Sequence, residues 1–182
     1  KGNSNGGSWA DFVYGGLRNR EVTNGNFFGK GENNFIYINN GDGTFKKRLE
    51  GILATDQSKS MSGLWEDFDA DGVLDLLITT YIHDNTLYLN NGDGTFKKNS
   101  QDLITKIAGY GTGIGTGDYD NDGDPDVFVA NWENQNNELY ANNATNKNWL
   151  KIRLQTQKLN RFAVGAKITL QTEKAGKTYS QM

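Results

Sequence analysis

The feature that most constrains this sequence is an internal repeat with a period of 51 residues. The nine residues Asn39–Lys47 (N-N-G-D-G-T-F-K-K) recur letter for letter as Asn90–Lys98. An acidic segment, Asp67–Asp75, recurs with the same offset as Asp118–Asp126. Because two different segments share one period, the chain is built from similar units, each of which must bury apolar surface against its neighbour.

A third, weaker copy of the acidic segment is predicted at the start of the chain, at residues 3–11. Asn3, Asn5 and Gly7 stand there at positions that hold carboxylates in the other copies, so that Asp11 is the one acidic residue. The step from this segment to the Asn-Asn pair at 39 is longer than in the second copy, which predicts an insertion within 15–31. The expected units are 1–57, 58–108 and 109–147, followed by a separate segment, 148–182.

Each unit is predicted to form short antiparallel β-strands. The Asn-Gly and Asp-Gly pairs favour tight hairpins because their residues tolerate positive φ. Helical periodicity is nearly absent, and we expect one turn of helix within 101–107. Four short strands in a unit of this length are typical of a propeller blade. The expected fold class is all-β, with about three propeller-type blades followed by a short β extension.

Composition excludes several classes of site and partner. The chain has no cysteine, which excludes disulfides, thiol catalysis and cysteine-based zinc sites. It has a single histidine, His83, which argues strongly against a histidine-based metal site or a Ser-His-Asp triad. The net charge of −3 gives no basic patch, so we expect no nucleic-acid partner. No apolar run approaches the ~18–20 residues of a membrane span.

The strongest chemical signal is the pattern D-x-D-x-D-G-x-x-D, which is intact twice. Calcium prefers six to eight oxygen ligands, and alternate carboxylates of a curled loop point to its inside. Glycine at position 6 permits the sharp turn, position 7 offers its backbone carbonyl, and the acid at position 9 closes the shell. The ligands expected in the second unit are the side chains of Asp67, Asp69, Asp71 and Asp75 with the carbonyl of Val73. The ligands expected in the third unit are the side chains of Asp118, Asp120, Asp122 and Asp126 with the carbonyl of Asp124.

Three other interpretations of this pattern are weaker. Aspartate and glycine favour turns, but four like charges within nine residues repel one another unless a cation lies between them. An EF-hand needs a glutamate at position 12 and a helix after the loop, whereas Ile78 or Val129 occupies that position inside a strand-like run. Magnesium demands stricter octahedral geometry than such a loop offers. We therefore expect two Ca²⁺ sites, and no tight third site at Asn3, Asn5 and Asp11.

These residues resemble the FG-GAP or VCBS repeat family, and Asn85–Phe96 is similar to the VCBS form of the repeat. The resemblance covers roughly residues 1–145 and implies the calcium-binding β-propeller blades of integrin α-chains and secreted bacterial proteins. The segments 148–154 and 160–170 alternate apolar and polar residues, which predicts half-buried strands. They resemble the start of an ASPIC/UnbV module, which follows such repeats in cartilage acidic proteins.

Together the two resemblances imply an extracellular, non-enzymatic, calcium-dependent module for adhesion, recognition or assembly. Its expected partners are a protein, a glycan or copies of itself. Three units do not close a propeller ring, so the chain is a fragment, an open array or one of several associating copies. The alternative is a carbohydrate-binding accessory part of a larger secreted enzyme. For Trp65, Trp132 and Trp149 we expect packing between units, with sugar stacking as the alternative.

Overall fold

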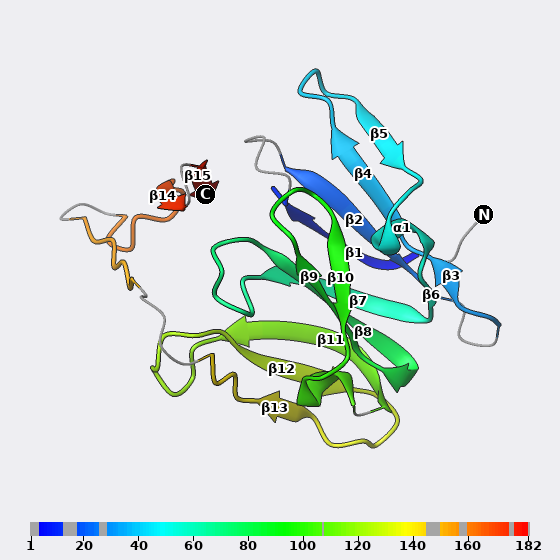
Figure 1. Cartoon of the computed structure of the whole chain (residues 1–182). Helices are drawn as coiled ribbons and strands as arrows, with labels where there is room; N and C mark the ends of the chain where they lie inside the picture. The colour runs from blue at the N-terminus through cyan, green and yellow to red at the C-terminus, as the bar shows by residue number, and fades with distance from the viewer. Residues whose placement is uncertain are drawn as a thin grey trace.

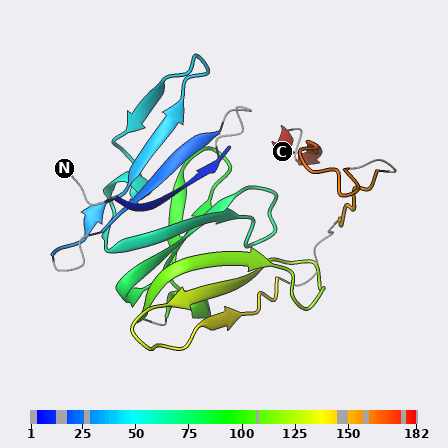
Figure 2. The ribbon, with the colours of Figure 1, turned by 180° about the vertical axis from the view of Figure 1, so that it is seen from behind.

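The computed structural model describes residues 4–12, 18–25, 29–106, 108–144, 150–156, 160–174 and 177–181. Nearly all of the regular structure is antiparallel β-sheet, which confirms the expected fold class. The strands form three successive groups, here called blades, which follow one another through the body of the molecule (Figure 1). The same succession is visible from behind (Figure 2).

Blades 1 and 2 each contain four strands in chain order. Blade 1 consists of β1 (Ser4–Ala10), β2 (Asn19–Asn24), β4 (Phe35–Asn39) and β5 (Phe45–Arg48). Blade 2 consists of β7 (Ser60–Glu66), β8 (Asp75–Asp84), β9 (Thr86–Asn90) and β10 (Phe96–Asn99).

Blade 3 has three strands among the described residues. They are β11 (Ala108–Gly117), β12 (Asp126–Asn131) and β13 (Glu138–Tyr140). The far end of β8 pairs with the start of β11, where Tyr110 lies opposite Tyr81. This pairing joins blades 2 and 3 into one continuous sheet.

Short elements connect the blades at corresponding places. Helix α1 (Ile52–Thr55) follows blade 1, and the 3-10 helix η1 (Leu103–Thr105) follows blade 2 at the same repeat position. The turn of helix expected within 101–107 is therefore η1. Strand β3 (Glu32–Asn33) pairs with β6 (Gln57–Ser58). A separate hairpin of β14 (Leu170–Lys174) and β15 (Lys177–Gln181) supplies the expected β extension.

The Asn-Gly-Asp-Gly turns form the predicted hairpins with the same hydrogen bonds in both blades. Asn40 N–H donates to the carbonyl oxygen of Thr44 at 3.0 Å, and Asn91 N–H donates to that of Thr95 at 3.0 Å. The glycines of the first turn have φ of 85° and 86°, which a residue with a Cβ adopts only with strain.

The register predicted for the first unit is wrong. Residues 4–10 form strand β1, paired with β2, and so cannot belong to a metal loop at 3–11. In blade 2 the acidic loop joins β7 to β8. The corresponding loop of blade 1 joins β1 to β2, from Asp11 to Asn19. The weak site considered at Asn3, Asn5 and Asp11 is thereby removed; Asn3 itself lies outside the described residues. The Ser/Gly-rich sequence of β1 has little strand propensity of its own, and pairing with β2 overrides it.

The extra residues of the first unit lie in the later part of the predicted stretch and just beyond it, between the end of β2 at Asn24 and the start of β4 at Phe35. The stretch 15–31 contains strand β2, and the longer connection runs from β2 to β4, where it carries β3. From the start of β2 to the start of β4 the chain advances from 19 to 35, whereas the corresponding step in blade 2 is from 75 to 86. Phe12 lies in a turn, and residues 13 and 14 lie outside the described residues.

The alternating segments near the C-terminus do not form the predicted strands. Residues 150–156 and 160–169 contain no strand, and the hairpin begins at Leu170. The side chains of Leu150, Ile152 and Leu154 are exposed. Alternation indicates a strand only where a neighbouring sheet receives the apolar face, and these side chains lack that cover.

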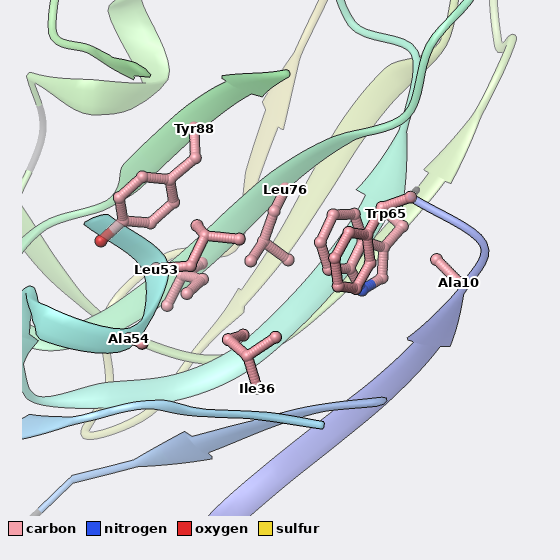
Figure 3. Packing of buried hydrophobic residues seen from close by; sticks show 9 residues of the cluster. Ala10, Ile36, Leu53, Ala54, Trp65, Leu76 and Tyr88 are labelled. Carbon is pink, nitrogen blue, oxygen red and sulfur yellow. The ribbon is translucent and has the colours of Figure 1, made fainter. Parts of the chain in front are cut away.

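The hydrophobic core lies between consecutive blades. Between blades 1 and 2, Trp65 stacks on Phe12 with ring centroids 4.6 Å apart, and Phe96 meets both rings edge-on. Figure 3 shows Ile36, Leu53, Leu76 and Tyr88 converging in the same cluster. A second cluster, between blades 2 and 3, contains the buried residues Leu77, Leu87, Ile104, Val127 and Val129.

The tryptophans follow the packing expectation in part. Trp65 is buried in the first cluster, as predicted. Trp132 is 53% exposed, so that the prediction of packing between units is wrong for it. Trp149 lies outside the described residues.

One carboxyl group is buried at the contact between blades 1 and 2. Glu21 in β2 is fully buried, and the hydroxyl of Ser8 donates to its Oε2 at 3.2 Å. A Cβ on Gly63 of β7 would lie 2.7 Å from the same Oε2, so Gly63 leaves the space that the carboxyl group occupies in this conformation. Burial raises the pKa of Glu21 to about 8, against the lowering effects of Ser8 and Arg20.

We expect Glu21→Gln to remove a pH dependence of stability. Between about pH 4.5 and 8 the folded parent holds a proton that the unfolded chain has released. The parent's free energy of unfolding should therefore fall as pH rises, by on the order of 4 kcal/mol. Urea unfolding at several pH values measures this slope. Glu50→Gln, at an exposed position, should keep the parent slope, and an unchanged slope in Glu21→Gln would contradict the account.

Candidate metal centres

The two acidic loops occupy the same place in blades 2 and 3. Residues 67–75 join β7 to β8, and residues 118–126 join β11 to β12. Both loops take positive φ at position 4, 52° at Ala70 and 64° at Asn121. Both do so again at position 6, where Gly72 and Gly123 have φ of 94° and 97°. The loops therefore curl in the same way, which turns alternate carboxylates to one side.

In the first loop, three of the predicted side-chain ligands come together. One carboxylate oxygen from each of Asp67, Asp69 and Asp71 lies within 4.8 Å of the others. Oxygens that ligate one calcium ion at ~2.3–2.6 Å lie at most roughly 5 Å apart. The spacing therefore suits a common calcium ion.

Hydrogen bonds to the backbone hold this first group in place. Asp67 accepts from the N–H groups of Asp71 and Gly72, each at 3.0 Å. Asp71 in turn accepts from the N–H of Val73 at 3.0 Å. The backbone of the loop itself therefore positions the carboxylates of Asp67 and Asp71.

Asp75, at position 9, is the structural anchor of the loop. It is fully buried and does not belong to the group of three. Its Oδ2 accepts from the N–H of Phe68 at 3.0 Å, and its Oδ1 accepts from that of Asn90 at 2.8 Å. The side chain therefore ties the loop to the end of β9. Its ligand role, and that of the Val73 carbonyl, stay predictions.

The second loop brings together a different set of three. Asp118, Asp120 and Asp126 each place one oxygen within 4.8 Å of the others. Asp126 also repeats the anchor of Asp75, because it accepts from the N–H groups of Tyr119 at 2.9 Å and Asn142 at 3.0 Å. Oδ1 of Asp118 is buried, and no described donor reaches it. A buried carboxylate oxygen without a donor is a site that a cation would satisfy.

Asp122 and Asp124 are not part of the second group. Asp122 accepts from the N–H of Asp124 at 3.2 Å, and Asp124 accepts from that of Ala144 at 2.8 Å. The side chain of Asp124 therefore points to the chain after β13. This leaves its backbone carbonyl as the predicted ligand, a role that stays a prediction along with that of Asp122.

Crowding and burial disfavour the ionised carboxylates in both loops. Burial, with added repulsion from Asp71 and Asp69, raises the pKa of Asp67 to about 6. Burial also raises the pKa of Asp75 to about 7. In the second loop the pKa values of Asp120 and Asp124 are raised too, first by desolvation and then by neighbouring carboxylates. A divalent cation would reverse this balance, because it favours the charged form of every neighbour.

The loop of blade 1 keeps the anchor but lacks the acids. Asn19 stands at the position of Asp75 and accepts from the N–H of Asn39 at 3.0 Å. The sequence places Val13 and Gly15 where the other loops have their second and third aspartates; both lie outside the described residues. An aspartate followed by an aromatic residue begins all three loops. This signal could have identified the loop of blade 1 from the sequence.

A cavity beside the first loop was missed by the sequence analysis. It has a volume of about 990 Å³ and lies between blades 2 and 3. Its wall includes Phe68 and Asp69 of the loop and Tyr140 of β13. The corresponding space between blades 1 and 2 is filled by Trp65 and Phe96. Thr116 replaces the tryptophan in blade 3, and no described fourth strand supplies the phenylalanine.

Comparison with protein families supports the repeat. The family described as FG-GAP-like repeat matches residues 4–78 and again residues 67–129. Each match extends from one blade into the next, and together they cover more than half of the chain. A comparison with curated proteins finds no match. The chain belongs to the FG-GAP-like repeat family.

Proposed function

We propose that this chain is an extracellular calcium-binding repeat module, in which two structural Ca²⁺ ions stabilise the contacts between blades. The observation that carries the proposal is the pair of carboxylate clusters at equivalent places, around Asp67 and Asp118. FG-GAP-like repeats are typical of extracellular and cell-surface proteins that bind other molecules. Of the helices in the described residues, none is long and apolar enough to cross a membrane.

The place of the loops supports a structural role for the ion. Phe68 belongs to the first loop, and its carbonyl oxygen accepts from Nδ2 of Asn142 in blade 3 at 3.0 Å. The aromatic ring of Phe68 packs in the cluster between blades 2 and 3. An ion held by Asp67, Asp69 and Asp71 would therefore order a loop on which the next blade rests.

We infer a binding or assembly role, with a protein, a glycan or further copies of the chain as the partner. Two glutamates outside the acidic loops have structural partners: the hydroxyl of Thr116 donates to Glu66, and that of Tyr140 donates to Glu138. These contacts support a non-catalytic module. We also propose that the segment 148–182 is the beginning of an ASPIC/UnbV-like module, which its sequence resembles.

The cavity between blades 2 and 3 favours a second candidate, a carbohydrate-binding accessory part of a secreted enzyme. Its wall combines the aromatic ring of Tyr140 with polar groups of Asn99 and Asn142, a mixture that suits a sugar. Binding of soluble polysaccharides that is lost in Tyr140→Ala would support this candidate over the first.

Removal of calcium should lower the melting temperature. Each occupied site contributes about 2.7 kcal/mol at 100-fold excess of ion over the Kd, which corresponds to roughly 5–10 °C per site. Scanning calorimetry with calcium and with EGTA measures the shift. The double variant Asp67→Asn, Asp118→Asn should melt at the EGTA temperature under both conditions. Asp84→Asn, at an exposed position, is the control and should melt like the parent. A parent melting temperature that is the same with calcium and with EGTA would refute the structural role.

Acid should weaken calcium binding. Without an ion, the raised pKa values of Asp67 (about 6) and Asp75 (about 7) leave protons on the loop near pH 6. Calcium must displace these protons, so its affinity should fall roughly tenfold per pH unit for each proton displaced. Calorimetric titration at pH 5.5 and 8 in buffers of different ionisation enthalpy measures both affinity and proton release. Equal affinities at the two pH values would contradict the expectation.

A further inference from the structure

One residue of blade 3, Asn142, contacts both acidic loops. Its backbone N–H donates to Oδ1 of Asp126, in the second loop (118–126), at 3.0 Å. Its side-chain Nδ2 donates to the carbonyl oxygen of Phe68, in the first loop (67–75), at 3.0 Å. Asn142 lies two residues after the end of β13 and belongs to neither loop. The two candidate metal centres are therefore connected through the backbone and the side chain of one residue.

At each end this connection reaches the part of the loop that would hold the ion. Asp126 is a member of the second group of three carboxylates. Phe68 stands between Asp67 and Asp69, which are both members of the first group. The N–H of Phe68 donates to the anchor Asp75 at 3.0 Å. The backbone of Phe68 is thus held on one side by its own loop and on the other side by blade 3.

The repeat contains the same connection between blades 1 and 2. Asn90 is the residue equivalent to Asn142, and its N–H donates to Asp75 at 2.8 Å. Its Nδ2 donates to the carbonyl oxygen of Phe12, in the loop of blade 1, at 3.2 Å. That loop has a single acidic residue, so this connection does not join two carboxylate groups. Between blades 2 and 3 the same connection has a carboxylate group at each end.

This geometry provides a way for one site to affect the other. An ion bound in the second loop would restrict the side chain of Asp126, because its carboxylate would become a ligand. The chain at Asn142 would then be restricted as well, since its N–H donates to that carboxylate. The amide of Asn142 would in turn hold the Phe68 carbonyl and the first loop. A ligand binds more tightly to a segment that is already ordered, because less conformational entropy is lost.

We propose that Asn142 couples the two calcium sites, so that an ion in either loop raises the affinity of the other loop. The effect must be equal in both directions, because coupling between two binding equilibria is reciprocal. Asn142 is a positioning residue, which acts through the carboxylate of Asp126 and the backbone of Phe68. Coupling between sites typically changes affinity by roughly 5–150-fold, and we expect about fivefold or more here. This coupling rests on the proposed calcium role.

Calorimetric titration with calcium measures the coupling through a thermodynamic cycle. Asp118→Asn keeps the first site alone, and Asp67→Asn keeps the second site alone. The overall association constant for both ions in the parent is divided by the product of these two single constants. We expect a ratio of about five or more. A ratio near one with two ions bound would overturn the coupling and leave the proposed calcium role standing, whereas a parent that binds no calcium would overturn both.

The variant Asn142→Ala tests the connecting residue. Alanine keeps the backbone N–H that donates to Asp126 and removes the amide that donates to Phe68. Both sites should therefore still bind calcium, while the ratio, measured with the two single-site variants in this background, should fall to about one. Far-UV circular dichroism checks that the variant is folded. A ratio that stays at the parent value would overturn the role of Asn142.

Two control variants alter neighbouring hydrogen bonds. Asn143→Ala removes an adjacent amide that donates to the carbonyl oxygen of Ala141 at 3.3 Å. Thr116→Val removes another hydrogen bond between blades 2 and 3, the one to Glu66, which belongs to neither carboxylate group. Both variants should keep the ratio of the parent. An equal loss of coupling in Thr116→Val would overturn the assignment of the coupling to Asn142.

Hydrogen exchange detects the coupling without a change at Asn142. In Asp67→Asn, calcium can occupy the second loop alone. The backbone amides of 67–75 should nevertheless exchange about twofold or more slowly in calcium than in EGTA, because the ordered Asn142 holds Phe68. Exchange measured by mass spectrometry on peptides from the two loops gives this comparison. Protection that is confined to 118–126 would overturn the coupling.

Discussion

The structure depends on the buried side chain at position 9 of each loop. Asp75 accepts one N–H from the start of its loop and another from Asn90 at the end of β9, and Asp126 accepts from the start of its own loop and from Asn142, two residues after β13. Asn19 keeps the second of these bonds in blade 1. This one side chain therefore fixes both the curl of the loop and its place against the sheet. The acids at positions 1, 3 and 5 are added to that frame, and their repulsion creates the need for a cation.

The blades share this frame but differ in what fills the space between them. Stacked aromatic rings fill the first contact, where Glu21 is nevertheless buried at the position that Leu77 holds in blade 2. In the second contact the tryptophan is replaced by Thr116, and a cavity remains. The repeat thus sets the architecture, while single substitutions decide how tightly each pair of blades is packed and how its stability responds to pH.

Exact repetition made much of this predictable from the sequence. The two loops and the hairpin turns were predictable because their backbone demands glycine or asparagine at set places, as at Gly72 and Gly92. The loop of blade 1 was misplaced because its position depends on the pairing between β1 and β2. The Ser/Gly-rich sequence of β1 does not predict a strand. The strands predicted within 148–154 and 160–170 are wrong for a related reason, because no sheet covers the apolar side chains that alternate at Leu150–Leu154. Which three carboxylates gather in each loop depends on side-chain geometry, and the pattern of aspartates is the same in both.

The most direct test of the account is a count of bound ions. Equilibrium dialysis against radioactive calcium at neutral pH should give two ions per chain in the parent, one in Asp67→Asn and one in Asp118→Asn. A parent that binds no calcium at millimolar concentration, while folded by circular dichroism, would contradict the claim that the two loops are calcium sites.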